Sequence, residues 1–397
     1  MFTGKACGLA SDGSAVVVVQ YGAETGRKFR VFGAAPGDTV TITPDTTEKN
    51  VAQLTEIIEP SPNRTEPQCP NFGTCGGCTL SHITHETQIK EKSALLLGNL
   101  KHLGGLNTLP ELKILSGSAF EYRNRVQFHK DTSMINEKPI KTRARALNLQ
   151  KKQTITTGFM AGKGKNIIPV QDCLVCDPVI RSALQQNAVV FPPDSDRITV
   201  YGRAGQLLME TGNANGVQTF AGKNIRLNAG VFFQSNGEML EILVKDLVEI
   251  AQTADKSMPA ADFYSGVGTF SVFLSDLFPK IDLLEENKAA VSIARENISA
   301  EKACFYALTD NKWVNSKPSH KKYGFIVVDP ARGGLSAAMC EWLCRQTAAT
   351  ICYVSCNPAA LARDAAALLR AGRALSQLAY YDFYPQTAHI ETLAVFH

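Results

Sequence analysis

The stretch Asp262-Phe263-Tyr264-Ser265-Gly266-Val267-Gly268-Thr269-Phe270 decides the fold of this chain. It lies where an apolar run predicted as a strand passes into a predicted helix. Glycines at positions 266 and 268 let the backbone turn tightly there and approach a ligand at the start of the helix. Ser271 occupies the place of the third glycine of a dinucleotide-binding fingerprint, so the loop alone is equally compatible with an ordinary strand–helix turn.

Strands and helices alternate on both sides of this loop. The predicted strands are Ala260–Tyr264, Lys280–Leu284, Tyr323–Val328 and Thr350–Val354, and the predicted helices between and after them are Lys288–Ser299 and Pro358–Ala371. Upstream, Ser235-Asn236-Gly237-Glu238 has the spacing of a capping box and predicts a helix that ends near Ile250. This alternation predicts a doubly wound parallel sheet, which binds its ligands at the carboxyl ends of the strands.

Two acidic residues follow predicted strands at that edge. Glu285 ends the second strand, nineteen residues after Gly266, where a carboxylate can accept hydrogen bonds from both hydroxyls of a ribose. Loop and acid together fit a nucleoside without a pyrophosphate, such as S-adenosylmethionine, better than they fit NAD. Asp329 follows the third strand, in Asp329-Pro330-Ala331-Arg332-Gly333-Gly334, and is expected to face the same crevice.

A cysteine follows the fourth strand, in Tyr353-Val354-Ser355-Cys356-Asn357-Pro358. Its place before a helix that Pro358 can start favours a nucleophilic thiolate for Cys356. The ordinary interpretation, a buried structural thiol, is kept for Cys304 and Cys352. Glu391 begins the last apolar strand, in His389-Ile390-Glu391-Thr392, but a glutamate at a strand end indicates little by itself.

The first half of the chain has a different pattern. Residues 1–60 contain short predicted strands separated by glycine and proline turns, which is typical of a small barrel. Cys69, Cys75 and Cys78 follow, and Cys173 and Cys176 come about a hundred residues later. Four sulfurs can hold zinc or an iron–sulfur cluster, and the spacing leaves the metal open.

Composition limits the class of protein. The chain is 44% hydrophobic and 20% charged, as in globular proteins, and its net charge of +4 identifies no partner. Between Glu121 and Lys165, however, eleven Lys and Arg face three Asp and Glu. A charge run by itself favours a solvated loop face, but this excess also indicates a polyanionic partner. We find no apolar signal segment or membrane-length stretch, so we expect a cytoplasmic protein whose cysteines are thiols or metal ligands.

Together these segments resemble the RNA uridine-5-methyltransferase family over nearly the whole chain. The motifs that carry the resemblance are Val231–Asn236, Asp262–Phe270, Asp329–Gly333, Tyr353–Pro358 and His389–Glu391. Residues 1–60 look like the TRAM domain, an OB-like RNA-binding barrel, and Cys69–His82 is similar to the segment that carries a 4Fe-4S cluster in some members.

The resemblance implies a fold and a division into domains. The fold is α/β, with a Rossmann-like class I methyltransferase domain over residues 229–397 and a TRAM barrel over residues 1–60. An iron–sulfur segment and helix are expected over 61–109, and a mixed α+β RNA-binding domain over 110–228.

The resemblance also implies the site. Cys356 is the expected nucleophile and Glu391 the general base. The residues expected to contact S-adenosylmethionine are Gln234, Tyr264, Thr269, Glu285, Asp310 and Asp329, and Thr269 stands where members often have Asn. The expected cluster ligands are Cys69, Cys75, Cys78 and Cys173, the last preferred over Cys176 because Pro178 keeps the five-residue offset of the family.

The implied reaction is methylation of carbon 5 of a uridine in RNA after addition of Cys356 to carbon 6, a reaction of enzyme class EC 2.1.1. The target base must leave its stack, and Phe232 by analogy stacks on it. The TRAM barrel and cluster favour 23S rRNA over tRNA as the substrate of a monomeric enzyme. The segment Arg143–Lys152 looks like an addition to the family pattern.

Two other classes of protein compete with this interpretation. A DNA cytosine methyltransferase also adds a cysteine to carbon 6, but its cysteine follows proline and precedes the later acidic motif, whereas Ser355 precedes Cys356 here. A non-enzymatic RNA-binding metalloprotein explains the barrel, the basic segment and the cysteines, but it leaves the motifs of the crevice unexplained.

Overall fold

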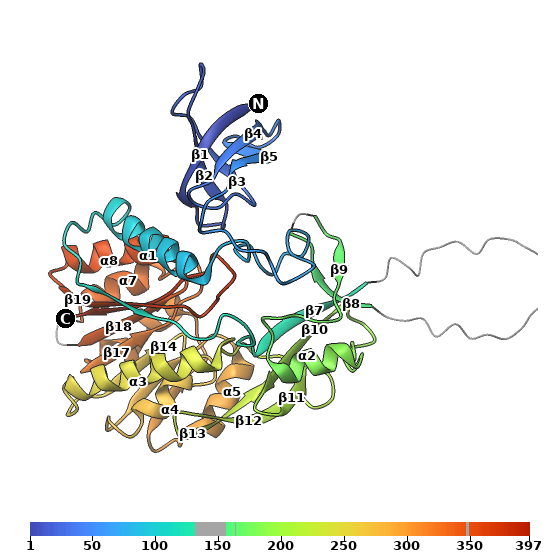
Figure 1. Ribbon diagram of the computed structural model, residues 1–397. Helices are drawn as coiled ribbons and strands as arrows, with labels where there is room; N and C mark the ends of the chain where they lie inside the picture. Colours follow the sequence, from blue (N-terminus) through green and yellow to red (C-terminus); the bar gives the residue numbers. More distant parts are fainter. Residues whose placement is uncertain (132–155, 163, 347–348) are drawn as a thin grey trace, which may run out of the picture.

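The computed structural model describes residues 1–131, 156–162, 164–346 and 349–397. Figure 1 shows a small β-barrel (blue), a central β-sheet (green) and a larger domain in which helices cover both faces of a sheet (yellow to red). The predicted α/β fold with an N-terminal barrel is therefore confirmed. The basic residues Arg143, Arg145, Lys151 and Lys152 lie outside the described residues.

The barrel is closed by its first and fourth strands. Its strands are β1 (Phe2–Leu9), β2 (Ala15–Val19), β3 (Lys28–Val31), β4 (Thr39–Pro44) and β5 (Val51–Glu59), in the order β1-β2-β3-β5-β4 with β4 paired to β1. The sequence predicts strands at Ala15–Val19, Arg30–Phe32, Thr39–Ile42 and Ala52–Glu56 but misses β1, because β1 contains two glycines and lacks a β-branched run. The barrel needs one of these glycines: a Cβ on Gly4 would lie 2.6 Å from Cγ1 of Val17 on the next strand.

The central sheet has five strands, in the order β11-β10-β7-β8-β9. They are β7 (Arg125–Asp131), β8 (Thr156–Met160), β9 (Ile167–Pro169), β10 (Arg197–Arg203) and β11 (Gln206–Met209). Helix α2 (Pro178–Gln185) packs on it, and a separate hairpin of β12 (Asn215–Phe220) and β13 (Lys223–Asn228) leads into the larger domain. Figure 1 shows the central sheet beside the larger domain, on its right in this view.

The larger domain is built on an eight-stranded sheet, in the order β16-β15-β14-β17-β18-β20-β19-β6. Its strands are β6 (Leu112–Leu115), β14 (Ala260–Phe263), β15 (Ile281–Leu284), β16 (Ala303–Tyr306), β17 (Phe325–Val328), β18 (Thr350–Ser355), β19 (Leu375–Tyr381) and β20 (Glu391–Phe396). The five strands from β14 to β18 are parallel. Four of them are the predicted strands, and β16 is an addition, while β20 runs antiparallel to β18. Strand β6 comes from the range predicted as the central domain and pairs with β19 at the edge.

Alternate side chains of these strands enter two separate cores. On one face, Phe325 and Val327 pack with α3 (Gly237–Thr253), α4 (Thr269–Leu274) and α5 (Lys288–Asn297). On the other, Ile326 and Val328 pack with α1, α6, α7 and α8. These helices span His85–His102, Asp310–Val314, Ala337–Cys344 and Pro358–Arg370, and a 3₁₀ turn, η2, spans Lys317–His320. Burial on both faces explains why these strands read as continuous apolar runs.

The start of α3 differs from the predicted capping box. Asn236, and not Ser235, is the N-cap: its side-chain oxygen accepts a hydrogen bond from the N–H of Met239 at 3.1 Å. The carbonyl of Ser235 is taken by the N–H of Asn124. Glu238 accepts a hydrogen bond from the N–H of Ser118 at 3.2 Å, so contacts with distant segments shift the cap by one residue.

Candidate active site

The predicted ligand loop turns through three residues in the left-handed region. Tyr264, Gly266 and Gly268 have φ values of 64°, 54° and 80°. At Gly268 a Cβ would also lie 3.0 Å from Cδ1 of Ile298, so side-chain packing as well as backbone conformation favours glycine. The turn delivers Thr269, which is buried, to the first position of α4.

The carboxyl end of β15 places Glu285 against this loop. One oxygen of Glu285 accepts a hydrogen bond from the N–H of Gly266 at 3.0 Å, and the other accepts from Asn287 at 2.7 Å. Tyr264 donates its hydroxyl hydrogen to Asp310 at 2.8 Å. The structure thus brings the predicted residues Tyr264, Glu285 and Asp310 to one edge of the sheet.

A second acidic group lies at the ends of β14 and β17. Asp329 accepts a hydrogen bond from Nε2 of Gln234 at 3.1 Å, and burial followed by repulsion from Asp262 raises its pKa to about 7. Asp262 is fully buried and binds Ser271 through one oxygen, but its Oδ1 has no partner among the described residues. The sequence analysis names Asp262 only as part of the loop and not as a binding residue. A carboxylate within an apolar strand was a signal that could have identified it. An unpartnered buried oxygen beside Gln234 and Asp329 suits an ammonium donor such as that of S-adenosylmethionine.

Cys356 lies in the tight turn between β18 and α8. Asn357 caps α8 by accepting from Ala359 at 3.0 Å, and its amide donates to the carbonyl of Arg332 at 2.7 Å, which ties the two loops together. The thiol of Cys356 is half-buried. Burial, and then the carboxylates of Glu391 and Asp329, raise its pKa to about 11, whereas Arg332 acts in the opposite direction.

Glu391 begins β20 and is 4% exposed. Burial, and then repulsion from Asp329, hold the pKa of its carboxyl well above its ordinary value. At the rim, Arg332 approaches Nε2 of His389 at 3.2 Å. Cys356, Glu391 and Asp329, distant in the sequence, therefore lie close enough to interact electrostatically, with Arg332 near Cys356.

One large aromatic side chain of the Val231–Asn236 segment faces solvent. Phe232 is 58% exposed, and the guanidinium of Arg125 lies 5.6 Å from the centre of its ring. An exposed ring beside a cation suits a stacking role towards a nucleobase, which stays a prediction.

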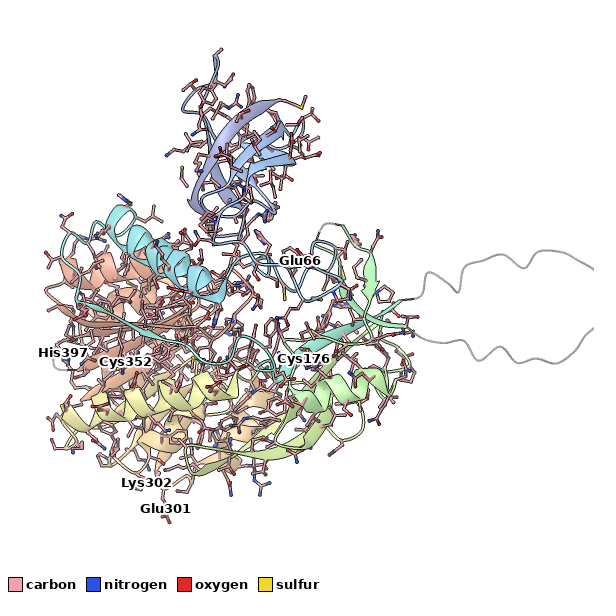
Figure 2. All side chains as sticks on the ribbon, in the orientation of Figure 1. Glu66, Cys176, Glu301, Lys302, Cys352 and His397 are labelled. Carbon is pink, nitrogen blue, oxygen red and sulfur yellow. The ribbon has the colours of Figure 1, made fainter. Side chains whose placement is uncertain are left out.

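The predicted metal ligands line a different cavity, of about 330 Å³, between the Cys69–Cys78 segment and the central sheet. Cys69, Cys75, Cys78, Cys173 and Cys176 all contribute to its wall as free thiols, and Figure 2 shows Cys176 where the central sheet meets the larger domain. The turn at Gly76 is held against β8, because its N–H donates to the carbonyl of Met160 at 2.9 Å. In the described part of the chain, no three His, Cys, Asp or Glu side chains are arranged around a single metal ion, so the metal prediction is not confirmed here.

Among the described residues, no helix is long and apolar enough to cross a membrane.

Comparison with known proteins identifies the family. The model of the family described as tRNA (Uracil-5-)-methyltransferase matches residues 317–396, which include Asp329, Cys356 and Glu391. A protein of Treponema denticola named as an uncharacterized RNA methyltransferase is 33% identical over 375 residues, covering 87% of this chain and 86% of its own length. A 23S rRNA (uracil(1939)-C(5))-methyltransferase of Shewanella sp. (strain W3-18-1) is 27% identical over 430 residues, covering 94% of this chain and 91% of its own.

A solved structure shares the fold. The Pyrococcus abyssi tRNA (uracil-54, C5)-methyltransferase, in complex with S-adenosyl-L-homocysteine, superposes with a TM-score of 0.71 at 20% identity and covers all of both chains. The 33% sequence identity with the Treponema protein, over most of the length of both chains, is stronger evidence than the shared fold, because proteins can share a fold at lower identity. The chain therefore belongs to the family of RNA uracil-5-methyltransferases, enzymes that depend on S-adenosylmethionine.

Proposed function

We propose that this enzyme methylates carbon 5 of a uridine in 23S rRNA through a transient bond between Cys356 and carbon 6 of the base. The observation that carries the proposal is the pairing of Ser355 with Thr392, which brings Glu391 next to Cys356 at the ends of β20 and β18. Relatives that span 94% of this chain are named as 23S rRNA enzymes, which supports ribosomal RNA over tRNA. We expect it to act as a monomer in the cytoplasm.

The methyl donor fits the acidic edge of the sheet. Glu285, which lies next to the loop at Gly266, is the proposed acceptor for the ribose hydroxyls. Gln234, Asp329 and the unpartnered Oδ1 of Asp262 offer acceptors for an ammonium group. Thr269, Tyr264 and Asp310 complete the proposed contacts. The donor supplies an electrophilic methyl group on a sulfonium.

Cys356 makes carbon 5 of uracil nucleophilic. Its Sγ forms a bond to carbon 6, and the electron pair of the C5=C6 bond moves into an enolate. Carbon 5 then takes the methyl group as the methyl–sulfonium bond breaks with its electron pair. A thiol whose pKa is raised to about 11 gives a strongly nucleophilic thiolate once it ionises, and Arg332 is the nearby cation that favours ionisation.

Glu391 completes the cycle. It removes the hydrogen from carbon 5, and the electron pair of that bond restores C5=C6 as the bond between Sγ and carbon 6 breaks. Because burial raises the pKa of Glu391, its carboxylate is a stronger base than an exposed glutamate. Product and free thiolate result, with no electron from outside.

We propose that the cysteine cavity holds a 4Fe-4S cluster through Cys69, Cys75, Cys78 and Cys173. The support for this proposal is that these thiols, far apart in the sequence, line one shared cavity. A cluster there would supply a rigid link between the Cys69–Cys78 segment and the central sheet. Anaerobically purified protein should contain iron and acid-labile sulfide, whereas stoichiometric zinc without either would contradict this assignment.

We propose further that the four domains predicted from the sequence have separate roles in RNA binding and catalysis. The barrel of residues 1–60 and the central domain bind RNA, while residues 229–397 carry the chemistry.

The test of the function is transfer of labelled methyl to RNA and trapping of the adduct. Wild-type enzyme should label one uridine of unmodified 23S rRNA, and mapping 5-methyluridine in a deletion strain should show that the same position is unmodified. Glu391→Gln should accumulate a denaturation-resistant protein–RNA adduct that carries the methyl label. Cys356→Ala should form none, and labelling of tRNA alone would assign the enzyme to the other substrate.

A further inference from the structure

The loop between β19 and β20, residues 382–390, is held by groups from other parts of the chain. Four successive carbonyls, at residues 383 to 386, each accept a hydrogen bond from outside the loop. The donors are Nδ2 of Asn236 at 3.1 Å, Nζ of Lys92 at 3.2 Å, the hydroxyl of Tyr122 at 2.8 Å, and the N–H groups of Thr79 and Leu80, both at 3.0 Å. The backbone of this loop is thus fixed by the cysteine segment, by α1, by the central domain and by the start of α3.

Two buried side chains of α1 make the most contacts. Nζ of Lys92 lies 2.6 Å from Asp382, and both side chains are at most 1% exposed. Gln88 accepts a hydrogen bond from the N–H of Gln386 at 2.8 Å and donates to its side-chain oxygen at 3.1 Å. The same amide of Gln88 donates to the carbonyl of Leu80 at 3.1 Å, so one side chain joins the loop to the segment that follows Cys78.

The conformation of the loop requires such support. Gln386 has a φ of 67°, in the left-handed region, which a residue other than glycine keeps only where its surroundings hold it. A buried ion pair such as Lys92–Asp382 is a poor source of stability compared with apolar packing, so a role in fixing geometry accounts for it better.

The 382–390 loop leads directly to Glu391, the proposed base, and contains side chains that lie near it. Tyr381, the last residue before the loop, pairs with Glu391, so the loop closes directly on the proposed base. Within it, the ring of Tyr384 packs edge-on against His389, 5.7 Å between centres, and Tyr384 is the residue whose carbonyl Lys92 holds.

We propose that Gln88 and Lys92 are positioning residues for the methyl-transfer site, which fix the 382–390 loop and thereby Tyr384 and Glu391. This inference rests on the proposed function, because Glu391 must be the base. It links α1 and the cysteine segment to the last chemical step through hydrogen bonds, without any electron transfer.

The decisive variant is Gln88→Leu, which keeps the volume but leaves the N–H of Gln386 without its acceptor. Turnover should fall by about 10²-fold, the size of effect that a small misplacement of a catalytic group produces. The KM for S-adenosylmethionine should stay unchanged, since Gln234, Glu285 and Asp329 lie outside the loop. Because the misplaced group acts last, the methyl-labelled adduct should accumulate on unmodified RNA, as in Glu391→Gln.

Two variants on the same helix serve as controls. Ser93 is buried next to Lys92, and its hydroxyl has no partner in the described part of the chain, so Ser93→Ala should behave as wild type. Leu96→Ala removes fully buried packing and should lower the thermal midpoint, with no accumulation of adduct.

The results of these assays separate a positioning role from a merely structural one, and both from a failure of the proposed function. Wild-type turnover in Gln88→Leu, or a loss of turnover without adduct as expected of a merely unstable protein, overturns the inference. If Gln88→Leu does not fold, the double variant Lys92→Met/Asp382→Asn, which replaces the ion pair by neutral groups of similar shape, is judged by the same adduct assay. A wild-type enzyme that methylates no RNA defeats the proposed function instead.

Discussion

The crevice and the cysteine cavity place the same side chain in opposite surroundings. In the crevice, burial, Glu391 and Asp329 raise the pKa of Cys356 to about 11. In the cavity, a hydrogen bond with Cys176 is the largest effect on Cys173 and lowers its pKa to about 7. Cys78, in the same cavity, has its pKa raised to about 12 by burial and by the neighbouring thiols. The proposed nucleophile is thus held protonated by burial and by nearby carboxylates, whereas the thiols of the cavity have pKa values on both sides of the ordinary cysteine value.

The two regions also differ in how they are assembled. The crevice is formed by loops at one edge of a single sheet, all from residues 229–397, apart from the anchors of the 382–390 loop. The cavity is formed by four segments: the Cys69–Cys78 turn, strand β7, strand β8 and the turn that contains Cys173 and Cys176. The proposed reaction site thus depends on one sheet, whereas the proposed metal site depends on how separate segments meet.

The largest expected effect is the loss of methyl transfer on mutation of Cys356, the proposed nucleophile, compared with mutation of Cys173, a proposed cluster ligand. Cys356→Ala should reduce methyl transfer by on the order of 10⁴-fold or more, because the enolate no longer forms. Cys352→Ala is the control: this thiol is buried inside the sheet (Figure 2) and touches no part of the proposed reaction. Cys173→Ala should lose iron, yet any folded protein should still form the methyl-labelled adduct in a single-turnover experiment. Absence of adduct from folded Cys173→Ala would place the cavity in the chemistry.

The next effect is a pH dependence, which tests the raised pKa of Cys356. Since the folded-state pKa lies above neutrality, the thiol is protonated at pH 7 and its thiolate fraction rises with pH. Alkylation of Cys356 by iodoacetamide should therefore accelerate about tenfold per pH unit between about pH 7 and about pH 9. Glu391→Gln removes a negative neighbour and should speed alkylation at fixed pH, while Arg332→Ala should slow it. A rate that is flat over this range would mean that the thiol is already ionised.

A smaller effect should fall on binding of the methyl donor. Glu285→Ala removes the acceptor placed for the ribose and should weaken S-adenosylmethionine by about 10- to 100-fold, the range of hydrogen bonds to a charged group. Calorimetric titration measures this directly. The neighbouring Glu286 is exposed, so Glu286→Ala should bind as wild type does. Equal affinities in both variants would remove Glu285 from the binding site.

The smallest effect concerns the basic segment outside the described residues. Changing Arg143, Arg145, Lys151 and Lys152 to Ala should weaken RNA binding and reduce its salt slope by roughly 0.7–0.9 for each phosphate that the protein no longer neutralises. Donor binding should stay the same. If affinity and slope are both unchanged, the segment is a solvated face.

The sequence determined the elements that follow local rules. Strands β14, β15, β17 and β18 were predictable because both of their faces are buried, which leaves uninterrupted apolar runs between helices. Strand β16 is only partly buried and was not predicted. The turn at Gly266 and Gly268, and the placement of Glu285, Asp329 and Cys356 after strands, followed from the rule that parallel strands bring their carboxyl ends to one edge. Glu391 was indicated only by the family resemblance, because a glutamate at a strand end has no local signature.

Only the tertiary structure decided the contacts between distant segments. The cap of α3 lies at Asn236 because the backbone N–H groups of Asn124 and Ser118 bind the carbonyl of Ser235 and the carboxylate of Glu238. The reason for glycine at position 4 of β1 became visible only in the structure, where Val17 of the next strand packs too closely to leave room for a Cβ. The anchoring of Gln386 by Gln88 joins residues almost three hundred positions apart, and no periodicity or spacing records it. Hydrogen bonds of this kind depend on where whole elements pack, and that is settled only when the sheet, α1 and the cysteine segment meet in space.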